Sequence, residues 1–290
     1  IMAITHGRGN YTTDAFMSSS PDFTSDKVIA YTNKPIKFID ASYRANSWYW
    51  DFGDGTSSTL QNPTKNYSSA GLYTVTLTIN GNLQKVRSNY IQILPNRGTP
   101  YTPADGGSFD INPLDFGADN FSGTSWQRGN SATAGKNGVF SGSNAWVTGL
   151  TGNYADNTDS RLMTPNFNLS AAGTYTLKLY RKNSFEIGYD GMRVEYTLDK
   201  GDSWLPLATT TSAGWYDFAN AVATTAFPIG QAYFNNTQSS FLLCQYNISS
   251  LAGNNNVDGT VIVDAVNGNV TFNETGDLVL NASNTAGEFS

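Results

Sequence analysis

The sequence predicts an all-β protein built of two sandwiches, and three observations lead to that prediction. The 290 residues are enough for about two domains. Apolar and polar residues alternate in short runs, which is typical of strands that place one face on a core. Only 14% of the residues are charged, while 28 glycines and many β-branched and aromatic residues favour short strands joined by tight turns.

Residues 1–19 are expected to form an irregular segment, which contains the single histidine, His6. With one histidine in that position, neither a Ser-His-Asp triad nor a multi-histidine zinc site can be assembled from this chain. The opening residues lack the apolar core of a signal peptide. We therefore expect the chain to be a piece of a larger protein.

Residues 20–95 show the clearest period of two and predict a first antiparallel sandwich. Apolar side chains take alternate positions along three runs, which are Ile36 and Phe38, then Trp48, Trp50 and Phe52, then Tyr73, Val75, Leu77 and Ile79. Turn residues recur about every dozen residues between these runs.

The stretch "WDFGDG", residues 50–55, places two carboxylates and two glycines directly after a strand. Glycine tolerates the positive φ of a turn, and Asp accepts hydrogen bonds from nearby backbone amides. We interpret Asp51, Gly53, Asp54 and Gly55 as a structural turn. A calcium-ligand role for Asp51 or Asp54 is the alternative.

The segment "WYWDFGDGTSSTLQNPTKNYSSAGLYTVTLTI", residues 48–79, resembles the PKD domain, an immunoglobulin-like module. Its hallmarks are the W-D-F-G-D-G turn, an N-P-T-x-x-Y segment and a G-x-Y-x-V-x-L strand, and all three are present. The resemblance covers roughly residues 20–95. It implies an immunoglobulin-like sandwich that serves as an extracellular spacer or adhesive module without catalysis.

Residues 96–107 are rich in proline and glycine and predict a linker. Strand-like runs return over residues 108–269, with long loops of Asn, Gly and Ser between them, and suggest a larger jelly-roll sandwich. The predicted strands cover residues 145–148, 175–181, 192–198, 241–248 and 260–266. Residues 270–290 are expected to add strands, at 270–272 and 278–280, or to begin a further module.

The run "TLDKGDSW", residues 197–204, predicts a hairpin in which Asp199 caps turn amides, Gly201 takes a positive φ and Trp204 packs beneath. The run fits the Asp-box pattern of sialidases, which carry several copies, whereas this chain has one. A glycosidase also needs a pair of facing carboxylates or an equivalent nucleophile and acid. Nothing in the sequence identifies such a pair, so no enzyme activity is expected.

Most of residues 108–267 resemble the MAM-like or carbohydrate-binding-like jelly rolls of large secreted proteins of Bacteroidetes. The resemblance rests on "GSNAWVTGLTGNYADNTDSRLMTPNFNLS", "YDGMRVEYTLDKGDSW" and a closing "DGTVIVDAV". That family usually closes with D-G-x-x-I-D-D-V after an aromatic-rich strand. Because Asn254–Val257 run directly into Asp258 here, we expect a strand to be shortened or absent. The resemblance alone implies delivery by type IX secretion.

Four aromatic residues, Trp126, Tyr189, Trp215 and Tyr216, lie in loop-like contexts and are the candidates for ligand binding. The C–H face of a sugar ring stacks on exposed aromatic rings. The predicted partner is therefore a glycan or a surface protein, with neighbouring modules of the same polypeptide as the alternative. The four rings could also plug the ends of the sandwich.

A structural calcium ion is predicted for the jelly roll, since such folds often tie their loops with Ca²⁺ held by carboxylate and carbonyl oxygens. Asp190 precedes one strand and Asp264 lies in the closing strand, so the two are the candidate pair if those strands end at the same edge. The altered closing motif argues against a site at Asp264, and the alternative is that both carboxylates cap turns.

Charge and cysteine content exclude several classes of function. The net charge of -6 and the absence of a Lys/Arg cluster argue against nucleic acid as a partner. No apolar run approaches the roughly 20 residues of a membrane span, so direct membrane insertion is not expected. Cys244 is the only cysteine, which excludes an intrachain disulfide and favours a buried thiol.

The sequence thus predicts a non-catalytic adhesion or substrate-binding region of a large secreted or cell-surface bacterial protein, located outside the cell or on its outer surface. The alternative is that these are accessory domains of a secreted hydrolase, a peptidase or a glycanase, whose catalytic domain lies outside this chain. A stalk without a ligand is a third interpretation.

Overall fold

The computed structural model describes residues 2–4, 10–12, 18–97, 109–133, 137–219, 227–265 and 268–273. Within these ranges the regular elements are β-strands, apart from one 3-10 turn, η2 (Ser249–Leu251). The all-β prediction is therefore confirmed. No helix among the same residues has the length and apolar character of a membrane span. His6 lies outside the described residues.

The chain divides into two compact units. Unit 1 comprises Ile1–Val28, Pro35–Tyr67 and Leu72–Ile91. Unit 2 comprises Ile29–Lys34, Ser68–Gly71 and Gln92–Ser290.

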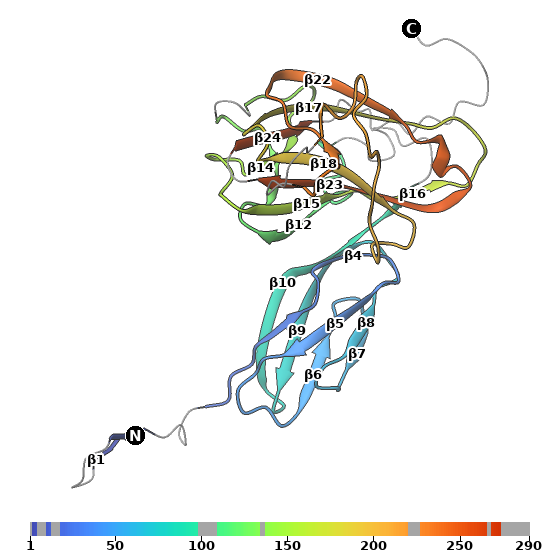
Figure 1. The fold of residues 1–290 in the computed structure, drawn as a ribbon. Helices are drawn as coiled ribbons and strands as arrows, with labels where there is room; N and C mark the ends of the chain where they lie inside the picture. The colour runs from blue at the N-terminus through green and yellow to red at the C-terminus, as the bar shows by residue number, and fades with distance from the viewer. Residues whose placement is uncertain are drawn as a thin grey trace. The chain divides into compact units, whose positions relative to one another are not determined.

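The first sandwich consists of a three-stranded and a five-stranded sheet (Figure 1). The three-stranded sheet has the order β3 (Phe23–Ser25), β5 (Pro35–Asp40), β8 (Thr64–Asn66). The five-stranded sheet has the order β4 (Ile29–Tyr31), β10 (Leu83–Leu94), β9 (Gly71–Ile79), β6 (Trp48–Asp51), β7 (Ser57–Ser58). β4 and β10 run parallel, whereas β3–β5, β5–β8, β6–β7 and β6–β9 are antiparallel, so the arrangement is the immunoglobulin-like sandwich that the sequence predicts.

The alternating pattern of the first sandwich places its apolar face in the core, as predicted. Trp50 on β6 has no exposed surface, and the same holds for Val75 and Leu77 on β9. The indole N–H of Trp50 donates to the Leu60 carbonyl at 2.9 Å, and its ring lies edge-on to Phe23 with the centroids 5.2 Å apart. A large apolar side chain with its one polar atom satisfied can be buried without an unpaired donor.

The second sandwich is the larger and has the two-layer form of a jelly roll. Figure 1 shows β12, β15, β23 and β18 in one layer and β14, β24, β17 and β22 in the other. The first layer comprises β11 (Asn96–Arg97), β12 (Gly117–Ser122), β15 (Thr158–Met163), β16 (Asn166–Leu169), β18 (Gly191–Thr197), β19 (Leu205–Pro206) and β23 (Asn254–Ala265). The second comprises β13 (Trp126–Gly129), β14 (Ala145–Thr148), β17 (Thr176–Phe185), β22 (Gln238–Asn247) and β24 (Gly268–Asn273). A separate two-stranded ladder joins β20 (Phe218–Ala219) and β21 (Ala232–Tyr233).

The closing strand differs from the expectation of a shortened or absent element. β23 runs without a break from Asn254 to Ala265 and follows the aromatic-containing strand β22. Its first part pairs with β16, with Phe167 opposite Val257, and its second part pairs with both β15 and β18. Backbone pairing does not depend on apolar side chains, so the asparagine-rich start of β23 still forms ladder hydrogen bonds.

Two further segments depart from the expected organisation, and a third agrees with it. Within residues 1–19, which were expected to be irregular, β1 (Met2–Ile4) pairs with β2 (Asn10–Thr12). In the expected linker, Asn96–Arg97 form β11 and pair with β16, while residues 98–107 lie outside the described residues. The predicted strand at 270–272 is part of β24, which pairs with β14 and β17 and so belongs to the jelly roll. The predicted strand at 278–280 lies outside the described residues.

Candidate functional site

Three of the four aromatic residues that were candidates for ligand binding are buried. Trp126, Trp215 and Tyr216 expose 2%, 3% and 1% of their surface, whereas Tyr189 exposes 51%. The burial of these three agrees with the alternative that the rings plug the sandwich, because large side chains fill a wide two-sheet interior to native density. Trp126 also lies on strand β13 rather than in a loop.

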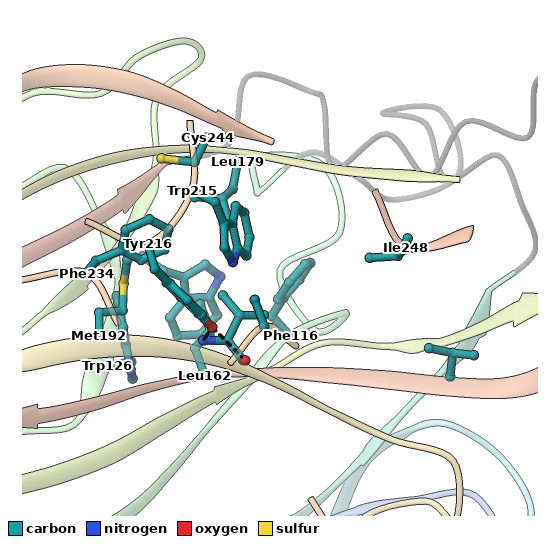
Figure 2. Packing of buried hydrophobic residues seen from close by; sticks show 14 of the residues in the cluster. Phe116, Trp126, Leu162, Leu179, Met192, Trp215, Tyr216, Phe234, Cys244 and Ile248 are labelled. Atoms are coloured by element: carbon teal, nitrogen blue, oxygen red, sulfur yellow. Dashed lines mark hydrogen bonds between the residues drawn. The ribbon is translucent and has the colours of Figure 1, made fainter. Parts of the chain in front are cut away.

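Trp215 and Tyr216 anchor the loop that connects β19 to β20. The Tyr216 hydroxyl donates to the Val194 carbonyl and accepts from the Val194 amide, both at 2.9 Å, as the dashed lines in Figure 2 show. The Trp215 and Tyr216 rings pack on Phe234, with centroids 5.3 and 4.9 Å away. Burial raises the pKa of Tyr216 above its ordinary value, so the phenol stays protonated and can keep donating.

The same loop is tied to the edge of the second layer. The Gln245 amide on β22 donates to the Gly214 carbonyl at 3.1 Å. A tight turn precedes this contact, in which the Trp215 amide donates to the Ser212 carbonyl at 3.1 Å and Gly214 has a φ of 74°. Glycine adopts such a φ without steric cost. The loop is therefore held both by its own turn at Ser212–Trp215 and by the bond between Gly214 and β22.

A groove of about 640 Å³ opens between this loop and the start of β22. Its volume lies within the range of roughly 300–1,000 Å³ typical of small-molecule sites. The lining combines a charged pair, amides, hydroxyls and the two anchoring aromatic residues. The lining residues are Arg181, Ser212, Ala213, Gly214, Trp215, Tyr216, Asp217, Asn236, Thr237, Gln238 and Leu242.

Arg181 lies at the inner end of the groove with its guanidinium almost wholly buried. Its Nη2 pairs with an Asp217 carboxylate oxygen at 2.5 Å, its Nη1 donates to the Asn183 side-chain oxygen, and its Nε donates to the Cys244 sulfur at 3.3 Å. The guanidinium carbon lies 4.3 Å from the centroid of the Phe234 ring. A buried charge is tolerated only with such partners, so each contact also fixes the position of the guanidinium.

Asp217 completes the pair and also orders the opposite wall of the groove. Its second carboxylate oxygen accepts from the backbone amides of Asn235 and Asn236, at 2.8 and 3.3 Å. One side chain therefore links β17, through Arg181, to the loop that leads into β22. Removing the carboxylate would leave both a buried guanidinium and two amides without this acceptor.

Cys244 is a buried thiol, as predicted, and lies beneath the charged pair. Burial raises the pKa of this thiol, and the nearby Arg181 opposes the shift without reversing it. The thiol is therefore protonated near neutral pH and acts as a weak hydrogen-bond partner of the guanidinium.

The sequence interpretation missed Arg181 and Asp217. One signal was available: Arg181 follows Leu179 at an inward position of its strand, and a charge on the apolar face of a strand requires a buried partner. The identity of that partner depends on a contact across 36 residues and cannot be read from a local pattern.

The two residues predicted to bind calcium lie at strand ends that are neighbours. Gly191 pairs with Asp264, so the start of β18 lies beside the end of β23. The Asp190 side chain is fully buried, and one of its oxygens accepts from the Tyr154 hydroxyl at 2.8 Å and from the Glu186 amide at 3.3 Å. The side chain of Asp264 lies outside the described part of the structure.

The described surroundings of Asp190 supply donors where a calcium ion would need free oxygens. The Asn235 side-chain amide donates to the carbonyls of Asp190 and Glu186, at 2.6 and 3.2 Å. Calcium requires about six to eight oxygen ligands. Within the described residues no three His, Cys, Asp or Glu side chains gather into a metal-binding group. The described contacts therefore fit a hydrogen-bonded turn better than a calcium site, and the ion remains a prediction.

The carboxylates of the W-D-F-G-D-G stretch make turn contacts. Asp51 accepts from the Gly53 amide at 2.9 Å, and Asp54 accepts from the Thr56 amide at 3.1 Å and pairs with Lys65 at 2.6 Å. Partial burial acts to raise the pKa of Asp54, but the bonds from Lys65 and Thr56 outweigh it and lower the pKa.

Glycine is required in this turn by both conformation and space. Gly53 has a φ of 77°, and a Cβ at this position would lie 2.4 Å from the Thr74 carbonyl oxygen. Gly55 also has a positive φ, of 83°, but with open space around it. A side chain at Gly53 would therefore clash with the neighbouring strand, whereas one at Gly55 would meet only backbone strain.

The hairpin after β18 is organised around Asp199. Its carboxylate accepts from the Ser203 amide at 2.9 Å and from the hydroxyls of Ser203 and Thr197, each at 2.5 Å. The bonds from Ser203, followed by that from Thr197, hold the pKa of Asp199 well below its usual range. Gly201 has the positive φ, 89°, that the hairpin needs.

Comparison with known proteins identifies residues 24–93 as a PKD domain. This match covers the first sandwich and agrees with the resemblance of the W-D-F-G-D-G stretch. No curated protein matches the chain.

Solved structures match only distantly. A carbohydrate-binding module of the β-sandwich superfamily matches with 13% identity and a TM-score of 0.35, over 89% of this chain and 96% of that chain. SGBP-B from a xyloglucan utilization locus of Bacteroides uniformis matches with 10% identity and a TM-score of 0.31, over 88% and 71%. The K1 cleaved adhesin domain of Lys-gingipain from Porphyromonas gingivalis W83 matches with 16% identity and a TM-score of 0.32, over 56% and 91%. Likenesses this distant carry no information about the ligand of the present chain.

Proposed function

We propose that this chain is a non-catalytic binding region that acts outside the cell and holds a carbohydrate in the groove of unit 2. The observation on which the proposal rests is the groove itself, in which a fixed Arg181–Asp217 pair, uncharged polar side chains and aromatic residues converge.

The chemistry of the lining suits a sugar. A sugar ring presents hydroxyls around its rim and C–H groups on its faces, so it is bound by planar polar groups together with apolar surface. Thr237 and Gln238 supply a hydroxyl and an amide, while Leu242 and Trp215 supply apolar surface. Trp215 and Tyr216, two of the residues first proposed as ligand contacts, thus contribute as the floor of a groove rather than as exposed platforms.

The same lining favours binding over catalysis. Glycoside hydrolysis generally needs two carboxyl groups that face each other across the scissile bond. Among the described lining residues Asp217 is the only carboxylate, and it is engaged by Arg181 and two backbone amides.

The first sandwich supports a location outside the cell and a spacer role. PKD modules resemble immunoglobulin domains and serve as extracellular spacers, and the Asp51 and Asp54 carboxylates of this one are used in turn contacts. A glycan on a cell surface or in the surrounding matrix is therefore the partner that we propose, rather than nucleic acid.

The experiment is a calorimetric titration of the purified chain with a panel of soluble plant and microbial oligosaccharides. Leu242→Ala should weaken the binding of any glycan that binds by about tenfold or more, because Leu242 lines the groove. Leu243→Ala is the matched control, since Leu243 is the next residue of β22, is similarly exposed at 36% against 41%, and does not line the groove. Equal effects of the two substitutions on glycan affinity would show that the glycan does not bind in the groove.

A further inference from the structure

The charged pair in the groove indicates which class of sugar it takes, if the groove binds a carbohydrate as proposed above. We propose that the groove selects an uncharged sugar, bound through its hydroxyl groups, and rejects sugars that carry a carboxylate or a sulfate. The proposal follows from which half of the Arg181–Asp217 pair is accessible and from the charges of the remaining lining residues.

The accessible half of the pair is the negative one. The side chain of Arg181 exposes 3% of its surface, whereas that of Asp217 exposes 19%. Each of the three guanidinium nitrogens already donates to a protein group, namely Asp217, Asn183 or Cys244. An acidic ligand therefore cannot reach the guanidinium in the bidentate geometry by which arginine usually binds carboxylates. It would instead meet the edge of the Asp217 carboxylate.

A cationic ligand is disfavoured for the complementary reason. The charge of Asp217 is balanced by Arg181 at 2.5 Å and is further satisfied by the amides of Asn235 and Asn236. An incoming ammonium group would have to compete with a guanidinium that is fixed by its own contacts. The groove thus presents a neutral pair whose outward side can still accept a hydrogen bond from a neutral hydroxyl.

The rest of the lining adds no charge. Arg181 and Asp217 are the only charged residues among the described residues of the groove, and the polar ones around them are Ser212, Asn236, Thr237 and Gln238. Hydroxyl and amide groups both donate and accept, as sugar hydroxyls do. An uncharged sugar can be satisfied by these groups without leaving a charge unpaired, whereas an acidic sugar would lose its hydration without gaining a cation.

The experiment compares matched pairs of oligosaccharides on the full chain by calorimetry. Each pair shares its linkage and stereochemistry and differs at C6, for example α-1,4-galactotriose and α-1,4-trigalacturonate, or a gluco-oligosaccharide and the glucuronic-acid counterpart with the same linkage. In any pair of oligosaccharides of which one member binds, we expect the neutral sugar to bind at least tenfold more tightly than the acidic one. We also expect its Kd to change less than twofold between low and high salt, because no net charge is neutralised on binding.

Charge probes on the rim test the same point without touching the buried pair. Ser212 is exposed and its backbone, rather than its side chain, makes the turn contacts, so Ser212→Lys and Ser212→Glu should both fold. Both substitutions replace a lining hydroxyl with a charged side chain of similar reach, so they should weaken the binding of the neutral sugar by the same factor, to within twofold of each other. Binding of the acidic sugar that is tighter than that of the neutral one, and that rises with Lys and falls with Glu, would overturn the proposal, because it would show that the groove prefers an anionic ligand.

A third variant changes the Arg181–Asp217 pair itself. Asp217→Asn removes the accessible negative charge and leaves the charge of the Arg181 guanidinium uncompensated. The affinity of the variant for the acidic sugar should therefore come closer to its affinity for the neutral one. Its melting curve is compared with that of the unmodified chain, and if it fails to fold, the Ser212 variants decide. If the unmodified chain binds the acidic sugar more tightly than the neutral one, and in a salt-sensitive way, the proposed selectivity is overturned while the proposed function stands. Failure of every pair to bind overturns the proposed function as well, so the two failures are distinguishable.

Discussion

Truncation of Trp50 is the sharpest perturbation of the first sandwich. The side chain has no exposed surface, packs edge-on to Phe23 at 5.2 Å and against Phe38 at 5.6 Å, and donates its indole N–H to the Leu60 carbonyl. Trp50→Ala removes all of these contacts and leaves a cavity, which typically costs about 3–5 kcal/mol. A domain of this size has a total stability of about 4–11 kcal/mol at 0.05–0.15 kcal/mol per residue.

The expected loss is therefore a large part of the stability of the first sandwich. Since each kcal/mol shifts the melting temperature of a small domain by about 4–8 °C, the Trp50→Ala transition should fall by at least about 12 °C. The assay is differential scanning calorimetry of the full chain, in which the transition of unit 2 serves as an internal reference. Tyr49→Ala is the matched control, because Tyr49 is the adjacent residue of β6 and exposes 51% of its surface. A Trp50→Ala transition within a few degrees of the unmodified one would refute the inward assignment of this strand.

Three further predictions concern single side chains of unit 2. The calcium ion predicted for Asp190 and Asp264 is tested by the melting temperature of the chain in excess calcium and in chelator: a rise with calcium supports the ion, whereas equal temperatures, expected if the carbonyls beside Asp190 keep their bonds from Asn235, rule it out. The lowered pKa of Asp199 means that its contribution to stability is complete above the unfolded-state pKa of about 4 and is lost as the pH falls towards its folded-state value. The urea midpoints of the unmodified chain and Asp199→Asn should thus differ at pH 7 and converge in acid, whereas a constant difference would contradict this role. Cys244 should react with a thiol reagent only at the rate of unfolding, since its thiol is buried and its pKa is raised; rapid labelling of the native chain would show that it is accessible.

Local patterns predicted the strands well because each strand needs only its own alternation to be recognised. The inward position of Trp50 and the buried thiol of Cys244 followed from the alternation and from an apolar run. The resemblance of the W-D-F-G-D-G stretch located the PKD domain, whose family match begins at residue 24 and ends at residue 93.

The groove could not be predicted in the same way, because its parts come from distant segments. Trp215 and Tyr216 lie in a glycine-containing loop whose sequence resembles an exposed one, and only the packing on Phe234 and the bonds to Val194 make them buried. The closing strand β23 posed a related difficulty. Its polar first residues pair with β16 through the backbone, and backbone pairing leaves no apolar signature in the sequence.

The central claim, that unit 2 binds a carbohydrate in this groove, is tested most directly by nuclear magnetic resonance mapping of the bound sugar. A neutral oligosaccharide that binds in calorimetry is titrated into isotopically labelled chain, and the amide and indole signals are followed. The account predicts that the shifts concentrate on residues 212–217, on the side-chain amide of Gln238 and on the indole of Trp215, while the exposed Tyr189 remains unchanged. Shifts centred on Tyr189, or on the first sandwich, with an undisturbed 212–217 loop would contradict it.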